Sequence, residues 1–216
     1  SMETGRPFED YAVLYRANAQ ARAIEDALNR FQIPYSIYGG TKFYERKEIK
    51  DLLAYLRIIV NPQDDISVKR VINVPRRGIG LRTIEKLEDR ASLMKESIYS
   101  VILDVDNNSD ISTKAKKSIN EFLDLISIFR TFVDAYSPSQ LVEKVLDMTG
   151  YIHELEEVVA KNQNLQNGKA EDAQDRIDNL KEFISIALEY ESSDLNNEEE
   201  KNLENFLATI SLSSDM

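Results

Sequence analysis

The sequence predicts a mostly helical chain that opens with a short α/β unit, so its fold class is α/β plus all-α. Apolar runs at residues 11–15 and 34–38 are too short for typical helices, and they flank a segment with helical spacing. From residue 40 onward, apolar residues recur at helical spacing and short polar breaks separate the segments. We therefore expect a βαβ unit followed by appended helices.

The N-terminal unit should place a site at one edge of a sheet. Residues 11–15 and 34–38 are expected to be parallel strands joined by a helix over residues 17–30. Gly39 and Gly40 would allow the chain to turn tightly at the end of the second strand. Tyr15 and Arg16 would then lie at the carboxyl end of a strand, where open α/β sheets bind ligands.

The rest of the chain reads as helices separated by recognisable stops. Asn61-Pro62, Pro75 and Gly150 should end helices, and Ser112 should cap a long one. The expected helices are residues 49–59, 66–74, 83–93, 112–134, 140–148, 151–159, 175–190 and 202–210. Residues 161–173 are expected to be mobile, and residues 191–201 to form an acidic loop. The polar break at 104–110 suggests two domains, residues 7–105 and 106–216.

Composition narrows the class of protein. The chain has 216 residues, 42% of them hydrophobic, which is enough for a substantial core, and no cysteine, which excludes disulfides and thiolate chemistry. No apolar run is long enough to span a bilayer and no signal-peptide pattern is present, so we expect a cytoplasmic protein without a membrane partner. Ser1-Met2 is typical of a cloning remnant, which suggests a piece of a longer protein.

The charge is unevenly distributed. The net charge is −11, yet residues 40–90 carry a net charge of +4 and the residues after them −14. The basic excess therefore lies on the segment that is richest in motifs, and the acidic part would repel phosphate.

Several motifs occur in a fixed order. They are YAVLYR at 11–16, IPYSIYGGTKFYERKEIKD at 33–51, AYLRIIVNP at 54–62, INVPRRGIG at 72–80 and, more weakly, AQDRIDNLKEF at 173–183. Together they resemble the UvrD/Rep/PcrA family of superfamily-1 DNA helicases, with the PcrA branch nearest. The resemblance covers nearly the whole chain, most strongly up to residue 87. It implies that residues 7–105 begin the second RecA-like motor domain (2A), and that 106–216 are most of the helical accessory domain (2B).

The resemblance also implies an ATP site in the longer protein, an ATP-dependent helicase that moves 3′ to 5′ along DNA in repair and replication. Tyr15 would pack against adenine, Arg16 would act catalytically at the γ-phosphate, and Gln20 is a weaker candidate contact. Without the resemblance, Tyr15 and Arg16 read as a core aromatic beside a surface arginine. ATP and Mg²⁺ are the expected cofactors. The chain has neither a phosphate loop nor an Asp-Glu pair on an apolar strand, so alone it should hydrolyse no ATP.

A second candidate site is a DNA-binding hairpin. Arg76 and Arg77 precede Gly78-Ile79-Gly80, and Thr83 opens the next helix. Two glycines around an apolar residue permit a tight turn whose N–H groups can bind phosphate without reading sequence. The alternative is an ordinary corner between helices with exposed arginines.

Two further basic segments are candidate DNA contacts. Lys42 lies in a run that mixes basic and aromatic residues, and Lys114 opens a helix beside two more lysines. Each can equally be structural; Glu48 is expected to be structural, and Arg46 is left open between a DNA contact and a structural pair with Glu48. His153 is the only histidine, so no metal site is expected.

The expected partners are a DNA single-strand/duplex junction, the missing motor domains of the same protein, and repair or transcription proteins. Two alternatives stay open at this point. One is a non-catalytic module that binds DNA or protein, and the other is a helicase subunit of a helicase–nuclease complex.

Overall fold

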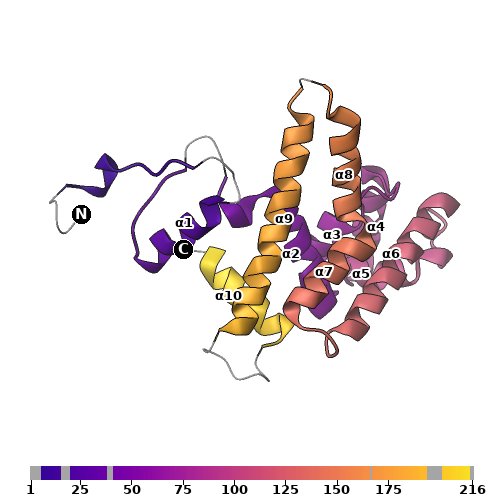
Figure 1. The fold of residues 1–216 in the computed structure, drawn as a ribbon. Helices are drawn as coiled ribbons and strands as arrows, with labels where there is room; N and C mark the ends of the chain where they lie inside the picture. Colours follow the sequence, from indigo (N-terminus) through magenta and orange to yellow (C-terminus); the bar gives the residue numbers. More distant parts are fainter. Residues whose placement is uncertain (1–5, 16–19, 38–40, 166, 194–200, 215–216) are drawn as a thin grey trace.

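The computed structural model describes residues 6–15, 20–37, 41–165, 167–193 and 201–214. These residues form ten α-helices and three short 3₁₀ helices (Figure 1). The α-helices are α1 (Gln20–Arg30), α2 (Lys47–Val60), α3 (Asp65–Val71), α4 (Leu81–Met94), α5 (Ile98–Leu103), α6 (Thr113–Phe132), α7 (Pro138–Thr149), α8 (Tyr151–Asn162), α9 (Lys169–Ser192) and α10 (Leu203–Ser214). The 3₁₀ helices are η1 (Phe8–Asp10), η2 (Phe43–Glu45) and η3 (Val105–Asn107).

The predicted βαβ unit is the main departure from expectation. None of the described residues lies in a strand, so residues 11–15 and the described part of residues 34–38 do not form the predicted strands. Leu14 is 93% exposed, which is opposite to the burial expected of a sheet core. A parallel strand obtains its hydrogen bonds from neighbouring strands, and no strand lies beside this segment within the part of the chain that the structure describes. The mostly helical prediction is confirmed, whereas the α/β part is not formed among these residues.

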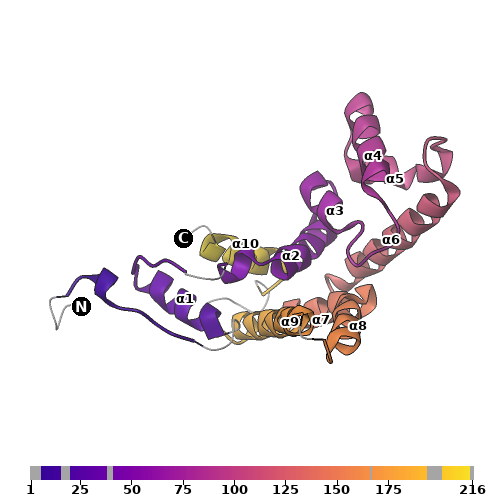
Figure 2. The same cartoon turned by 90° about the horizontal axis from the view of Figure 1, so that it is seen from above.

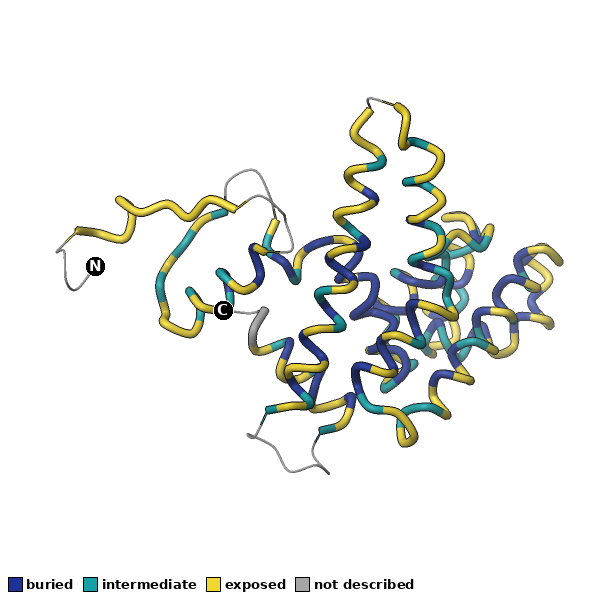
Figure 3. The backbone as a smooth tube through the Cα atoms, in the orientation of Figure 1, coloured by how far each residue is buried: buried dark blue, intermediate teal, exposed yellow. Residues whose placement is uncertain are grey.

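Helix α2 is the centre of the helical core. It packs against α3, α6, α7, α9 and α10. Ten of its fourteen residues are buried, among them Leu52, Leu56 and Ile59, and the dark blue centre of Figure 3 includes this helix. A helix that is apolar on nearly all sides must lie inside a protein, which explains its position.

The predicted cap at Ser112 is confirmed, and a second serine, Ser137, caps the helix that follows. The Ser112 side chain accepts a hydrogen bond from the Ala115 N–H at the start of α6, and Ser137 forms a capping box with Gln140 at the start of α7. Gly150 has φ of +73° and joins α7 directly to α8, because glycine adopts the left-handed conformation without a steric penalty.

Helices α8 and α9 form a long antiparallel hairpin that projects from the bundle (Figure 1). The prediction of a mobile segment over residues 161–173 is wrong at both ends, because α8 continues to Asn162 and α9 begins at Lys169. Ala173 and Ile177 are buried in this early part of α9. Two acidic residues in the first turn of α9 stabilise the helix, because they lie at the positive end of its dipole.

The hydrophobic core is one continuous cluster that runs from Phe43 to Ile210 and crosses the polar break at 104–110. Val105 and Ile111 belong to it on either side of the break, so the division into residues 7–105 and 106–216 stays a prediction. Viewed from above, α4 and α5 lie at the opposite end of the molecule from α1 and the N-terminal segment (Figure 2). Among the described residues, no helix is long and apolar enough to cross a membrane.

Candidate nucleic-acid interface

The loop between α3 and α4, residues 73–80, forms a tight hairpin that is held from within. The side-chain oxygen of Asn73 accepts hydrogen bonds from the backbone N–H groups of Arg77 (2.8 Å) and Ile79 (3.1 Å). Ile79 is fully buried and anchors the loop in the core, while Gly78 turns the chain with φ of +79°. The predicted turn is therefore present, and Asn73 is a shaping residue that the motif did not reveal.

Arg77 points into the protein and not toward solvent. Its Nη2 donates to the hydroxyl of Tyr55 (2.7 Å), and its guanidinium carbon lies 5.4 Å from the centre of the Phe122 ring. The hydroxyl of Tyr55 itself donates to the carbonyl of Val74, and burial raises the pKa of Tyr55 to about 12. The Nη1 of Arg77 lies within hydrogen-bond distance of four carbonyls, those of Val74 (2.9 Å), Val71 (3.1 Å), Pro75 (3.3 Å) and Ile72 (3.4 Å).

The start of α6 lies directly beside the hairpin. A Cβ atom placed on Gly78 would be 3.9 Å from Cε of Lys114, so the two predicted basic elements meet although they are far apart in sequence. Lys86 and Lys116 help to hold the loop before α6, because they donate to the carbonyls of Asp110 (2.8 Å) and Asp106 (2.7 Å).

Two helix N-termini contribute to this surface. Neither α4 nor α6 has an acidic residue in its first turn, and Gly80 caps α4 without a side-chain bond. Within the described parts of the chain, the N–H groups of Leu81 and Arg82 have no acceptor. The half-buried Thr83 lies in the same turn. Unpaired N–H donors and helix N-termini of this kind favour an anion.

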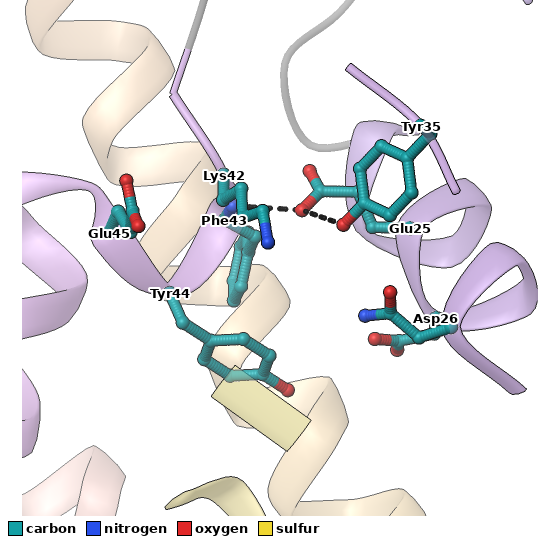
Figure 4. A pocket seen from close by; sticks show the side chains of 8 residues that line it. Glu25, Asp26, Tyr35, Lys42, Phe43, Tyr44 and Glu45 are labelled. Atoms are coloured by element: carbon teal, nitrogen blue, oxygen red, sulfur yellow. Dashed lines mark hydrogen bonds between the residues drawn. The ribbon is translucent and has the colours of Figure 1, made fainter. Parts of the chain in front are cut away.

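Lys42 lies elsewhere, at a pocket between α1 and η2 (Figure 4). Its ammonium group is 5.6 Å from the centre of the Tyr35 ring. Glu25 accepts hydrogen bonds from the Phe43 N–H (3.3 Å) and the Tyr35 hydroxyl (3.5 Å), and burial raises the pKa of the Glu25 carboxyl. Residues Glu25, Asp26, Asn29, Tyr35, Lys42, Phe43, Tyr44 and Glu45 line the pocket, whose three carboxylates make it unfavourable for phosphate.

The predicted ATP contacts are only partly placed. Tyr15 is 38% exposed at the end of the extended segment, and Gln20 is the first residue of α1. Arg16 lies outside the described residues. Among the described residues, no group of His, Asp and Glu side chains is arranged to hold a metal ion.

Two polar clusters tie the N-terminal part to α9. Asn179 accepts from Nη1 of Arg46 (2.6 Å) and donates to Glu48 (2.6 Å), so the predicted pair of Arg46 and Glu48 is linked through a third side chain. All three residues are buried, which favours the structural interpretation of Arg46.

Arg22 makes the second cluster and fastens α1 to α9. It pairs with Asp26 (2.8 Å), Glu182 (2.9 Å) and Glu189 (2.5 Å). Burial acts to lower the pKa of Arg22, but its three carboxylate partners outweigh this and raise it, so the group stays charged. No local signal in the sequence identified the contacts with Glu182 and Glu189, because these residues lie 160 and 167 positions away.

The whole chain, residues 1–216, matches the UvrD-like helicase C-terminal domain. Proteins described as ATP-dependent DNA helicase PcrA are similar to it, and the matches cover 98–99% of the chain: 39% identical in Bacillus subtilis (strain 168), 37% in Staphylococcus epidermidis and 36% in Staphylococcus aureus. The chain spans about a quarter of the length of these relatives, 26–27%.

Proposed function

This chain belongs to the UvrD-like helicase C-terminal domain family, and we propose that it serves an ATP-dependent DNA helicase by gripping the phosphate backbone of DNA. The observation that carries the proposal is the meeting of the 73–80 hairpin with the start of α6, where Lys114 lies against Gly78. Two helix N-termini without acidic residues in their first turns and two exposed cationic side chains, Arg76 and Lys114, would together favour a phosphate here.

Such a surface recognises charge and spacing, not bases. Arg76 is exposed, Lys114 is exposed, and the Leu81 and Arg82 N–H groups are unpaired within the described part of the chain. Gly78 and Gly80 leave room for close approach of a phosphate, while Ile79 and Thr83 support the turn. Contacts of this kind hold a duplex in register ahead of a motor without selecting its sequence.

The N-terminal segment would serve the motor in the longer protein. Residues 11–15 and 34–38 would gain strand partners from the rest of domain 2A, and Tyr15, Arg16 and Gln20 would then lie at the ATP-binding edge of the sheet. Lys42 stays a weaker candidate contact with single-stranded DNA, because the carboxylates of its pocket disfavour a phosphate beside it. The activity proposed for the whole protein is ATP- and Mg²⁺-dependent 3′–5′ unwinding in repair and replication.

The DNA grip is tested by fluorescence anisotropy with a single-strand/duplex junction over a range of salt concentrations. Each lost phosphate contact should reduce the slope of log K against log salt by about 0.9, so Arg76→Ala with Lys114→Ala should reduce it by roughly 2. The matched control is Lys161→Ala with Lys169→Ala, which removes the same charge from exposed positions on the α8–α9 hairpin. Equal slopes for the two double variants would contradict the proposal, and absence of binding would favour a protein-binding module.

The ATP contact is tested in the longer protein. Arg16→Ala should reduce the steady-state ATPase rate by about 10³-fold or more while DNA affinity stays unchanged, because an arginine at the γ-phosphate acts on the transition state. Arg30→Ala, at an exposed position of α1, is the matched control. An unchanged ATPase rate would refute the role of Arg16.

A further inference from the structure

Arg76 and Arg77 are adjacent in sequence but have opposite surroundings. Arg76 is exposed, and its backbone N–H is 3.5 Å from Glu154. The guanidinium of Arg77 is turned inward, and both of its terminal nitrogens are in use. Electrostatics alone would treat the two residues as equivalent phosphate ligands, whereas their contacts differ completely.

The contacts of Arg77 fix the path of the chain into the hairpin. The Nη1 group of Arg77 lies within hydrogen-bond distance of the carbonyls of Val71 and Ile72 at the end of α3 and of two carbonyls from the following turn. Tyr55 braces the same point, because its hydroxyl accepts from Arg77 and donates to the carbonyl of Val74. One cation therefore links α2, the end of α3 and the hairpin.

Arg77 also links the hairpin to the helix that carries Lys114. The guanidinium carbon of Arg77 lies 5.4 Å from the centre of the Phe122 ring, and Phe122 is fully buried on α6. Lys114 precedes Phe122 by eight residues on this helix, about 12 Å along its axis. A guanidinium held between Tyr55 and Phe122 thus sets the hairpin and α6 relative to each other.

We infer that Arg77, with Tyr55, is a positioning residue of the proposed DNA grip and does not itself contact phosphate. It places Arg76 and the first turn of α4 against Lys114, so that the cationic groups are arranged before DNA arrives. Asn73 completes the arrangement by occupying the N–H groups of Arg77 and Ile79, which leaves those of Leu81 and Arg82 for the ligand. This inference rests on the proposed function.

The test separates affinity from salt dependence in the junction-binding assay. Arg76→Gln should reduce the salt slope by about 0.9, because a phosphate ligand is lost. Arg77→Gln and Arg77→Lys should both weaken binding by about tenfold with the wild-type slope, because each disturbs the preorganised hairpin without removing a phosphate contact. Wild-type affinity in Arg77→Lys together with a reduced slope in Arg77→Gln would overturn the inference.

Tyr55→Phe provides a second, milder variant that removes only a hydroxyl and no charge. It should also weaken binding at the wild-type salt slope, and in a double-mutant cycle with Arg77→Lys the two losses should not add, because both break one contact. Thermal melts followed by circular dichroism identify a temperature at which every variant is folded. If the Arg77 variants do not fold, Tyr55→Phe decides: wild-type affinity in that variant overturns the inference.

Failure of the two proposals can be distinguished. If Arg76→Gln and Lys114→Ala leave the salt slope unchanged, the DNA grip itself is wrong. If those variants behave as expected and Arg77→Gln reduces the slope as well, the grip stands and the positioning role of Arg77 is overturned.

Discussion

The segment at residues 11–15 and the hairpin at residues 73–80 both carry sequence motifs, yet only the hairpin has the local structure that its motif predicts. Its turn is closed by Asn73, anchored by the buried Ile79 and braced by Arg77. In the N-terminal segment, residues 11–15 are extended and exposed. The difference shows that a motif closed by local hydrogen bonds forms where it stands, whereas a strand motif depends on neighbours elsewhere.

The largest effect should come from removing the anchor of the hairpin. Ile79→Ala should lower the free energy of unfolding by about 2–5 kcal/mol, because a fully buried side chain is replaced by a cavity. Leu14→Ala, at a position that is 93% exposed, should change it by less than about 0.5 kcal/mol. Urea unfolding measures the free energy of unfolding of both variants, and equal losses of stability would contradict the difference between the two regions.

The next effect should appear where α1 is fastened to α9. Arg22→Ala leaves Glu182 and Glu189 without their cation, so the free energy of local opening of α1 should fall by roughly 1–3 kcal/mol. Hydrogen exchange should show faster exchange in α1 and unchanged protection in α2. The exposed Arg30, changed to alanine, is the control. Wild-type exchange in α1 would mean that other contacts hold this helix.

Gly78→Ala tests the turn itself. With φ of +79°, an alanine should cost about 1 kcal/mol of stability from backbone strain. Gly80→Ala is the matched control, because φ there is −77° and the new Cβ meets nothing within 4 Å. Its effect should be close to zero, since the weaker N-cap offsets the reduced entropy of the unfolded chain. Equal losses in thermal unfolding would contradict this.

The smallest effect should be a pH dependence at the acidic pocket. Burial raises the pKa of Glu25 above its ordinary value of 4.5, so the folded state binds a proton more readily than the unfolded state. The stability that this proton supplies is therefore lost as pH rises through the interval between the two values. Glu25→Gln should flatten the decline in the melting temperature as pH rises above about 4.5. Glu45→Gln is the control, and a parallel decline in both variants would contradict the assignment.

Local signals in the sequence were sufficient for much of the fold. Ser112, Ser137 and Gly150 mark helix ends because their roles depend on a few neighbouring residues. The strands could not be judged in the same way, since pairing is non-local. The inward orientation of Arg77 was not predictable either. Arginines are usually exposed, and the Tyr55 hydroxyl that accepts a hydrogen bond from Arg77 lies on a different element, helix α2.

Helix α9 also has a mechanical consequence. Its 24 residues extend over about 36 Å, and only part of that length crosses α2 and α7. A tilt of about 5° at one end would displace the other by about 3 Å, so the projecting α8–α9 hairpin amplifies small rotations as a lever does. The chain contains no cysteine, and Leu165 is exposed near the tip. A single Leu165→Cys substitution would therefore accept one spectroscopic label, whose spectrum would report the change in its surroundings when the hairpin rotates.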